Sequence, residues 1–210
     1  RMASSRLPGK VMLHLGPERV VGHAMQNCER ASAPAGVILA IGDGLAHPAL
    51  VEWAERAGYD YVVGSEENVL ARHAHVAAET GADYVVRVCG DSPFVSAAEI
   101  DRLVDEHVGG DADMTTNASL APPGTVVEVA DVATLEALVD LGERHPSARL
   151  LDEPERWDVR RSGAAPWEDL SDVDMAVDTP ADYWRLVDAV DAAGRDPLSV
   201  ATWLRGERQV

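Results

Sequence analysis

The chain has 210 residues, enough for one domain with a substantial hydrophobic core. Its net charge of -18, from 36 acidic and 18 basic residues, argues against a general nucleic-acid or anionic-membrane surface. Its two cysteines lack the spacing of a metal or redox motif, and no apolar run approaches the ~18 residues of a membrane span. These features predict a cytoplasmic protein that binds neither nucleic acid nor a membrane.

Lysine is almost absent from this composition, since Lys10 is the only one in the chain. An acidic surface with so few lysines is typical of proteins adapted to high salt, and a GC-rich genome that replaces lysine by arginine would give the same result. Either origin leaves the retention of Lys10 unexplained. The segment around it is therefore a candidate functional element.

Short β-type runs alternate along the chain with longer amphipathic segments. Strands are predicted at residues 37–41, 59–63, 84–88, 113–117, 126–129 and 175–177. Helices are predicted at residues 48–57, 65–81, 96–109, 132–142, 181–193 and 198–205, with Ser65 and Ser96 at the start of the second and third. Residues 142–172 have a weak pattern and predict an irregular excursion within a single domain covering residues 1–210.

Strands that alternate with helices predict βαβ units. The expected fold is therefore α/β, with three α/β/α layers around a mostly parallel, Rossmann-like sheet. In such sheets, ligands bind beyond the carboxyl ends of the strands. The segments directly after the strands are where chemistry is expected.

The opening segment, "RMASSRLPGK", has the composition of a phosphate-binding loop. It combines cations and hydroxyls with a glycine that lets backbone amides approach a ligand closely, and these features come from Arg1, Arg6, Lys10, Ser4, Ser5 and Gly9. The proline at position 8 fixes part of the loop's shape. A solvated basic turn is the alternative interpretation.

Two predicted strands lead into an aspartate that is followed by a residue and then a proline, namely Asp91 in "CGDSP" and Asp178 in "VDTP". Mg²⁺ binds few protein carboxylates together with the phosphate oxygens of a substrate, so the pair predicts a shared metal site. The alternative for Asp91, considered by itself, is that it only caps the following turn. Helix capping explains Thr179 and Pro180 but does not explain the charge of Asp178.

Six motifs, in order, resemble the cytidylyltransferase family, in particular its acylneuraminate cytidylyltransferase-like and spore-coat polysaccharide branch. They are "RMASSRLPGK", "GSEENVLARH", "VVRVCGDSPF", "GDADMTTN", "PPGTVVEV" and "VDTPADY". The resemblance covers almost the whole chain and implies a sheet of the nucleotide-diphospho-sugar transferase type. It also implies an apolar, central first strand before Arg1, which this sequence lacks, so that two neighbouring strands are expected to be unpaired.

The reaction implied by the resemblance is transfer of CMP from CTP to an acidic sugar, giving a CMP-sugar and pyrophosphate for surface glycan biosynthesis. It implies that Arg6 and Lys10 hold the CTP phosphates and that Asp91 and Asp178 bind Mg²⁺. It further implies that Arg72 and Arg87 contact the nucleotide phosphates or the sugar carboxylate, and that Asn117 and Glu128 contact the sugar. His145, in the irregular excursion, is a further candidate for a substrate contact. A homodimer is also consistent with the family, with residues 122–129 as a candidate surface.

Two other functions stay open at this point. The missing first strand favours a non-catalytic relative that binds a nucleotide or sugar, or that serves as a partner subunit. A nucleotidyltransferase of the same fold could also use another base, because no base-reading residue can be assigned from the sequence.

Overall fold

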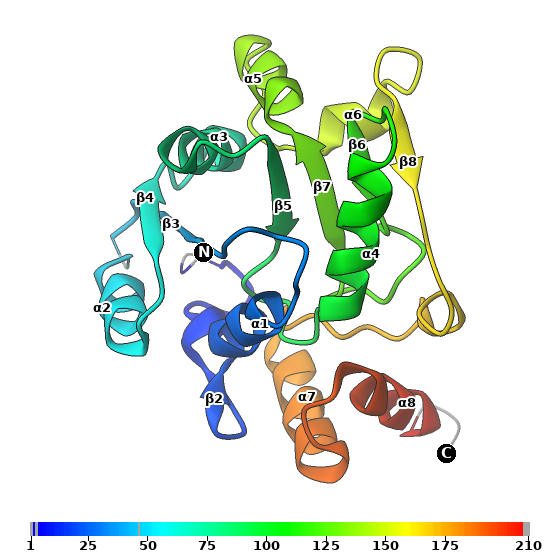
Figure 1. Ribbon diagram of the computed structural model, residues 1–210. Helices are drawn as coiled ribbons and strands as arrows, with labels where there is room; N and C mark the ends of the chain where they lie inside the picture. The colour runs from blue at the N-terminus through cyan, green and yellow to red at the C-terminus, as the bar shows by residue number, and fades with distance from the viewer. Residues whose placement is uncertain (1, 3, 46, 208–210) are drawn as a thin grey trace.

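The computed structural model describes residues 2, 4–45 and 47–207 (Figure 1). Its strands are β1 (His14–Leu15), β2 (Glu18–Arg19), β3 (Leu39–Gly42), β4 (Tyr61–Gly64), β5 (Tyr84–Val88), β6 (Met114–Thr116), β7 (Val127–Asp131) and β8 (Val159–Arg161). Its α-helices are α1 (Val20–Glu29), α2 (His47–Ala57), α3 (Val69–Thr80), α4 (Ala97–Val108), α5 (Val132–Asp140), α6 (Ala148–Asp152), α7 (Pro180–Ala193) and α8 (Pro197–Glu207). Two short 3₁₀ helices are η1 (Lys10–Met12) and η2 (Glu168–Leu170).

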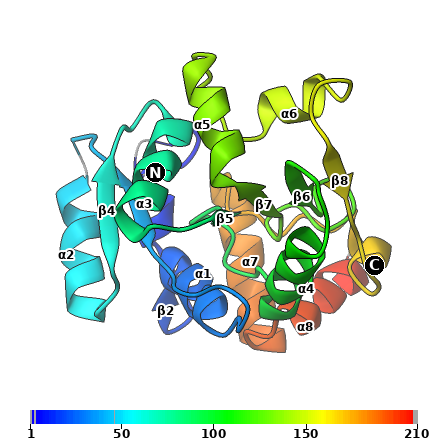
Figure 2. The ribbon, with the colours of Figure 1, turned by 45° about the horizontal axis from the view of Figure 1, so that its top comes forward.

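The predicted three-layer α/β/α architecture is confirmed. Figure 2 shows the strands in a middle layer, with α3 and α5 on one side and α1 and α4 on the other. Strand β7 shows how the sequence specifies the two faces. Val127 and Val129 pack with residues of α4, whereas Ala130 packs with residues of α3 and α5. This alternation with a period of two residues is that of a strand buried on both faces.

The sheet is mixed and not mostly parallel as predicted. β3 and β4 pair in parallel, and a second sheet has the strand order β5-β7-β6-β8. Within it, β7 runs antiparallel to both β5 and β6, and only β6 and β8 are parallel. The reason lies in the connection from β6 to β7, residues 117–126, which contains no helix and therefore cannot form the crossover that a parallel pair requires.

Several element boundaries also differ from prediction. Residues 175–177 form no strand, because the amides of Met175 and Val177 donate to single loop carbonyls and the amide of Ala176 donates to the Asp174 carboxylate. The helix expected from Ser65 begins at Val69, where the Asn68 side chain accepts a hydrogen bond from the Ala71 amide. Ser96 caps α4 as predicted. The irregular excursion at residues 142–172 contains α6, β8 and η2.

The two sheets do not join. Among the described residues, β3 pairs only with β4, and β5 pairs only with β7, so each strand has one unpaired edge. A groove of about 1340 Å³ is lined by residues of both strands and has mostly apolar walls. This separation agrees with the expectation that two neighbouring strands would be left unpaired.

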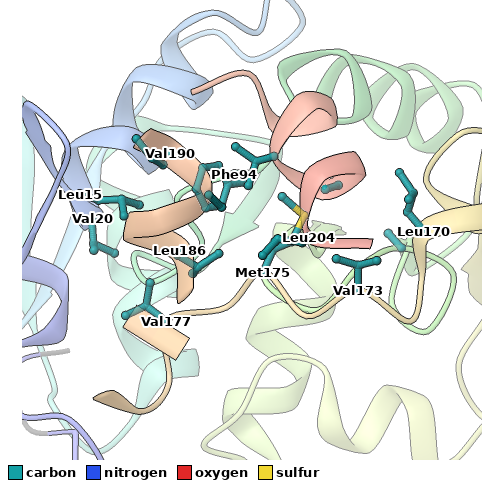
Figure 3. Packing of buried hydrophobic residues seen from close by; sticks show 14 of the residues in the cluster. Leu15, Val20, Phe94, Leu170, Val173, Met175, Val177, Leu186, Val190 and Leu204 are labelled. Carbon is teal, nitrogen blue, oxygen red and sulfur yellow. The ribbon is translucent and has the colours of Figure 1, made fainter. Parts of the chain in front are cut away.

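The C-terminal helices close the core at the opposite end from α5. A buried cluster gathers side chains from α7, α8 and the loop before them around Phe94 (Figure 3). Met175 and Val177 are fully buried in this cluster, although they lie in irregular chain. They anchor the segment that carries Asp178.

Candidate active site

Three charged side chains from distant parts of the sequence meet at one point. Lys10 opens η1, Asp91 lies three residues after β5, and Asp178 lies two residues before α7. The Lys10 Nζ atom is 2.5 Å from Asp91 Oδ2 and 2.8 Å from Asp178 Oδ1. Arg6 Nη2 contacts the other oxygen of Asp178 at 2.9 Å. The structure therefore brings together all four residues that were predicted to be catalytic.

The local conformation of each segment explains this convergence. Gly9 precedes η1 with a φ of 71°, a left-handed conformation that favours glycine, and its amide donates to the Met2 carbonyl. On the other side, Thr179 and Asp182 form a reciprocal capping box at the start of α7, with Pro180 at the first helical position. The Val177 amide donates to the Asp91 carbonyl and ties the two aspartate segments together.

Burial and pairing set the electrostatics of the site. Burial lowers the pKa of Lys10, but hydrogen bonds to Asp178 and Asp91 outweigh it, so that the pKa is raised overall. Burial raises the pKa of Asp178, and the hydrogen bond and charge of Lys10, with Arg6, lower it below its ordinary value. The Lys10 side chain is only 7% exposed, whereas that of Arg6 is 63% exposed. In this structure the Lys10 ammonium is therefore held between the two carboxylates with little room to move, whereas the exposed Arg6 side chain is able to turn toward a ligand.

A second charged pair lies on the neighbouring strands. Arg87 of β5 stands directly opposite Glu128 of β7, and its Nη1 atom is 2.5 Å from Glu128 Oε2. Arg87 Nη2 donates to the Cys89 sulfur at 3.3 Å. Burial raises the pKa of the Cys89 thiol, which keeps it protonated at neutral pH. Sequence reasoning assigned Arg87 to the nucleotide and Glu128 to the sugar, and did not predict their pairing.

The other predicted binding residues are placed differently. Arg72, Arg87, His145 and Asp91 all line the groove between β3 and β5. Arg72 is buried and donates to the Ser65 carbonyl. Asn117 does not reach the groove, because it is fully buried and bonded to the Val127 amide and to Glu99. A contact of Asn117 with sugar stays a prediction that would require these bonds to break.

The opening loop is partly described. The Ser4 hydroxyl accepts a hydrogen bond from the Leu7 amide at 3.3 Å, and Ser5 is exposed. The predicted role of Arg1 falls outside the described residues. His73 of α3, which was not among the predicted site residues, lines the same groove as Arg72, and burial lowers its pKa to about 4. Its position directly after Arg72 in α3 was the available signal.

The donor set at Asp91 and Asp178 suits a divalent cation. One ammonium nitrogen lies within hydrogen-bond distance of both carboxylates, so a single small cation could be shared by them. Mg²⁺ typically takes one or two protein carboxylates and completes its shell with water and substrate phosphate. No group of three or more potential His, Cys, Asp or Glu ligands occurs in the described chain. The residues therefore fit a metal that is bound together with its substrate.

Solved structures share this architecture. A cytidylyltransferase from Leptospira borgpetersenii superposes with a TM-score of 0.89 at 20% identity, covering 99% of this chain and 92% of that one. CMP:2-keto-3-deoxy-manno-octonic acid synthetase in complex with CTP superposes with a TM-score of 0.73 at 16% identity, covering 91% and 95%. At these identities the likeness shows a shared fold.

Sequence comparison gives the family. The cytidylyltransferase family matches residues 1–152, and this chain belongs to it. Spore coat polysaccharide biosynthesis protein SpsF of Bacillus subtilis is 28% identical over 206 residues, covering 94% of this chain and 86% of that protein. The 3-deoxy-manno-octulosonate cytidylyltransferase of Aeromonas salmonicida is 32% identical over 124 residues, covering 55% of this chain and 46% of that enzyme.

None of the helices in the described part of the chain has both the length and the apolar character that a membrane span requires.

Proposed function

We propose that this chain transfers CMP from CTP to the hydroxyl of an acidic sugar and releases pyrophosphate, in the biosynthesis of a surface glycan. The observation that carries the proposal is the convergence of Lys10 and Arg6 on Asp91 and Asp178. Two cations and two carboxylates that meet beyond the carboxyl end of β5, where Asp91 lies, are the groups that a nucleoside triphosphate and its metal require. Family membership supports the choice of CTP.

In this reaction the sugar oxygen attacks the α-phosphorus. A new oxygen–phosphorus bond forms, the bond from the α-phosphorus to the bridging oxygen breaks, and pyrophosphate leaves with that oxygen while the hydroxyl proton passes to solvent. Negative charge accumulates on the leaving group. Lys10 and Arg6 would neutralise this charge, and their position at Asp178 supports that role. Positioned charges supply most of the catalysis in phosphoryl-type transfer.

Asp91 and Asp178 would hold Mg²⁺, which when bound supplies charge neutralisation at the phosphate oxygens. In the structure the Lys10 ammonium satisfies these two carboxylates. Lys10 would then turn its ammonium from the carboxylates to the β-phosphate as the substrate arrives. The nearly complete burial of its side chain limits this to a short movement.

The test is pyrophosphate release from CTP, UTP, GTP and ATP in the presence of Mg²⁺ and a panel of acidic sugars. The proposal predicts release with CTP and at least one acidic sugar, and dependence on both. Release with another nucleotide in preference to CTP would identify a nucleotidyltransferase of different base specificity.

A second candidate is a non-catalytic relative that binds nucleotide or sugar, or acts as a partner subunit. The observation that favours it is that the Lys10 ammonium already pairs with both carboxylates, so that they have a cation without any metal. Binding of CTP without turnover of any sugar in the panel would be its signature.

A further inference from the structure

The segment that carries Asp178 has no regular structure, and yet its carboxylate must lie accurately beside Asp91. Residues 174–178 belong to no helix or strand. Two backbone hydrogen bonds hold the segment: the Met175 amide donates to the Pro123 carbonyl at 2.7 Å, and the Val177 amide donates to the Asp91 carbonyl at 3.3 Å. The first of these comes from the turn at residues 122–125, which lies outside the site described above.

Gly124 of this turn packs directly against the backbone of the Asp178 segment. Its φ is 87°, in the left-handed region. A Cβ atom at this position would overlap the Met175 carbonyl carbon and the Ala176 amide, and would lie 2.7 Å from Ala176 Cα. These are backbone atoms, so no side-chain rotation relieves the overlap. Only glycine allows the turn and the segment to pack backbone against backbone.

The turn itself is firmly attached to the sheet. The amide and hydroxyl of Thr125 both donate to the Pro122 carbonyl, at 3.0 and 2.8 Å, and the Thr125 side chain is buried. Two residues later the Val127 amide donates to the Asn117 side chain at 2.8 Å, where β7 begins. The turn therefore links the start of β7 to the backbone at Met175, three residues before Asp178, and fixes the position of that backbone relative to the sheet.

We propose that the turn at residues 122–125 positions Asp178, and that Gly124 is the residue through which it acts. The Asp178 segment is held from both sides: Met175 and Val177 are buried in the cluster shown in Figure 3, and the turn closes over the backbone between them. Displacement at Ala176 moves Asp178 relative to Asp91 and breaks the shared contact with Lys10. The inference rests on the proposed function only in taking Asp178 as a group that meets the substrate's metal.

Lys10 is the only lysine of the chain, so it reports this geometry without any substrate. Labelling lysine with ¹⁵N at Nζ gives a single side-chain signal. In the wild type the ammonium, 7% exposed and bound by two carboxylates, exchanges its protons slowly and gives a sharp correlated signal. We expect Gly124→Ala to lose that signal or to shift it to that of a solvated lysine.

Gly58→Ala is the matched control. Gly58 has a φ of 80°, similar to that of Gly124, but a Cβ atom there meets nothing within 4 Å. Both variants place alanine in a left-handed conformation and carry a similar backbone cost, but only Gly124→Ala disturbs the site. Thr125→Val is a milder second variant that preserves side-chain shape and removes the Oγ1 bond to Pro122, and it should change the lysine signal in the same direction.

The results separate this inference from the proposed function. If the wild type transfers no CMP, the proposed function is wrong. The positioning role still holds in that case if the lysine signal changes in Gly124→Ala and not in Gly58→Ala. Folded Gly124→Ala or Thr125→Val protein with the wild-type lysine signal would overturn the positioning role. A Gly58→Ala variant that alters the lysine signal equally would overturn it too.

Discussion

Arg87 and Glu128 face each other across β5 and β7 at 2.5 Å, with side chains only 17% and 9% exposed. Burial lowers the pKa of Arg87, but the nearby Cys89 and Glu128 groups raise it above its ordinary value overall. The guanidinium is therefore charged in the wall of the groove, and its charge is balanced by Glu128 before any ligand arrives. A phosphate or sugar carboxylate that binds Arg87 would have to share it with Glu128.

Replacing Glu128 tests the cost of leaving that charge unbalanced. Glu128→Gln should lower the free energy of unfolding by about 2–4 kcal/mol, because a buried guanidinium then loses its partner. Glu52→Gln is the control, since Glu52 pairs with Arg56 at the same 2.5 Å distance but is 60% exposed, and its loss should cost less than about 1 kcal/mol. Denaturant unfolding measures both, and equal effects would show that burial does not govern the pair.

Lys10 and Arg6 allow a comparison of two cations at one carboxylate. Lys10→Arg should reduce kcat by about 10- to 100-fold, because a planar guanidinium does not fit where a compact ammonium lies between two carboxylates. Arg6→Lys should have a smaller effect, because the Arg6 side chain is 63% exposed and is free to adjust. Steady-state pyrophosphate release checks the order. A larger loss with Arg6→Lys would contradict a fixed role for Lys10.

His73 predicts a pH dependence of stability. Burial, with the charge of Arg87, lowers its pKa to about 4 from the ordinary 6.5. Between these values the unfolded chain takes up a proton that the folded chain does not, so stability is complete above pH 6.5 and falls as the pH drops toward 4. The loss amounts to about 3 kcal/mol at most.

The measurement is the free energy of unfolding of His73→Gln at pH 7 and at pH 4.5. The fall between these pH values should be smaller in the variant than in the wild type by about 2 kcal/mol. His75→Gln, on the exposed side of the same helix, is the control and should follow the wild type. An unchanged pH dependence in His73→Gln would assign the acid sensitivity to other groups.

The layer architecture was predictable because β5 and the helix from Ser96 carry strong local signals. Helix α1 was not predicted, since polar His23 and Asn27 are buried in it and obscure its apolar face. Residues 175–177 have a strand pattern because both Met175 and Val177 are buried, but their hydrogen bonds go to loop carbonyls. The hydrophobic pattern of a segment indicates which of its residues are buried. Whether the segment pairs as a strand depends on which part of the chain lies next to it in the fold.

The candidate site was predicted as a set of residues but not as a geometry. Aspartates at strand ends indicated a cation site, and the basic loop indicated phosphate. That Lys10 itself bridges Asp91 and Asp178, across 168 residues of sequence in the second case, follows only from the tertiary fold. The burial of Asn117 likewise depends on Glu99 and Val127, which its own sequence motif does not contain.

The central claim is that Asp91, Asp178 and Lys10 form the site of CMP transfer. The most direct measurement is kcat for pyrophosphate release from CTP and an acidic sugar, at saturating Mg²⁺, for the wild type and Asp178→Asn. We expect a loss of at least about 100-fold in protein that stays folded at the assay temperature, because one carboxylate that would hold the metal is removed. Activity of Asp178→Asn within a few-fold of the wild type would contradict it.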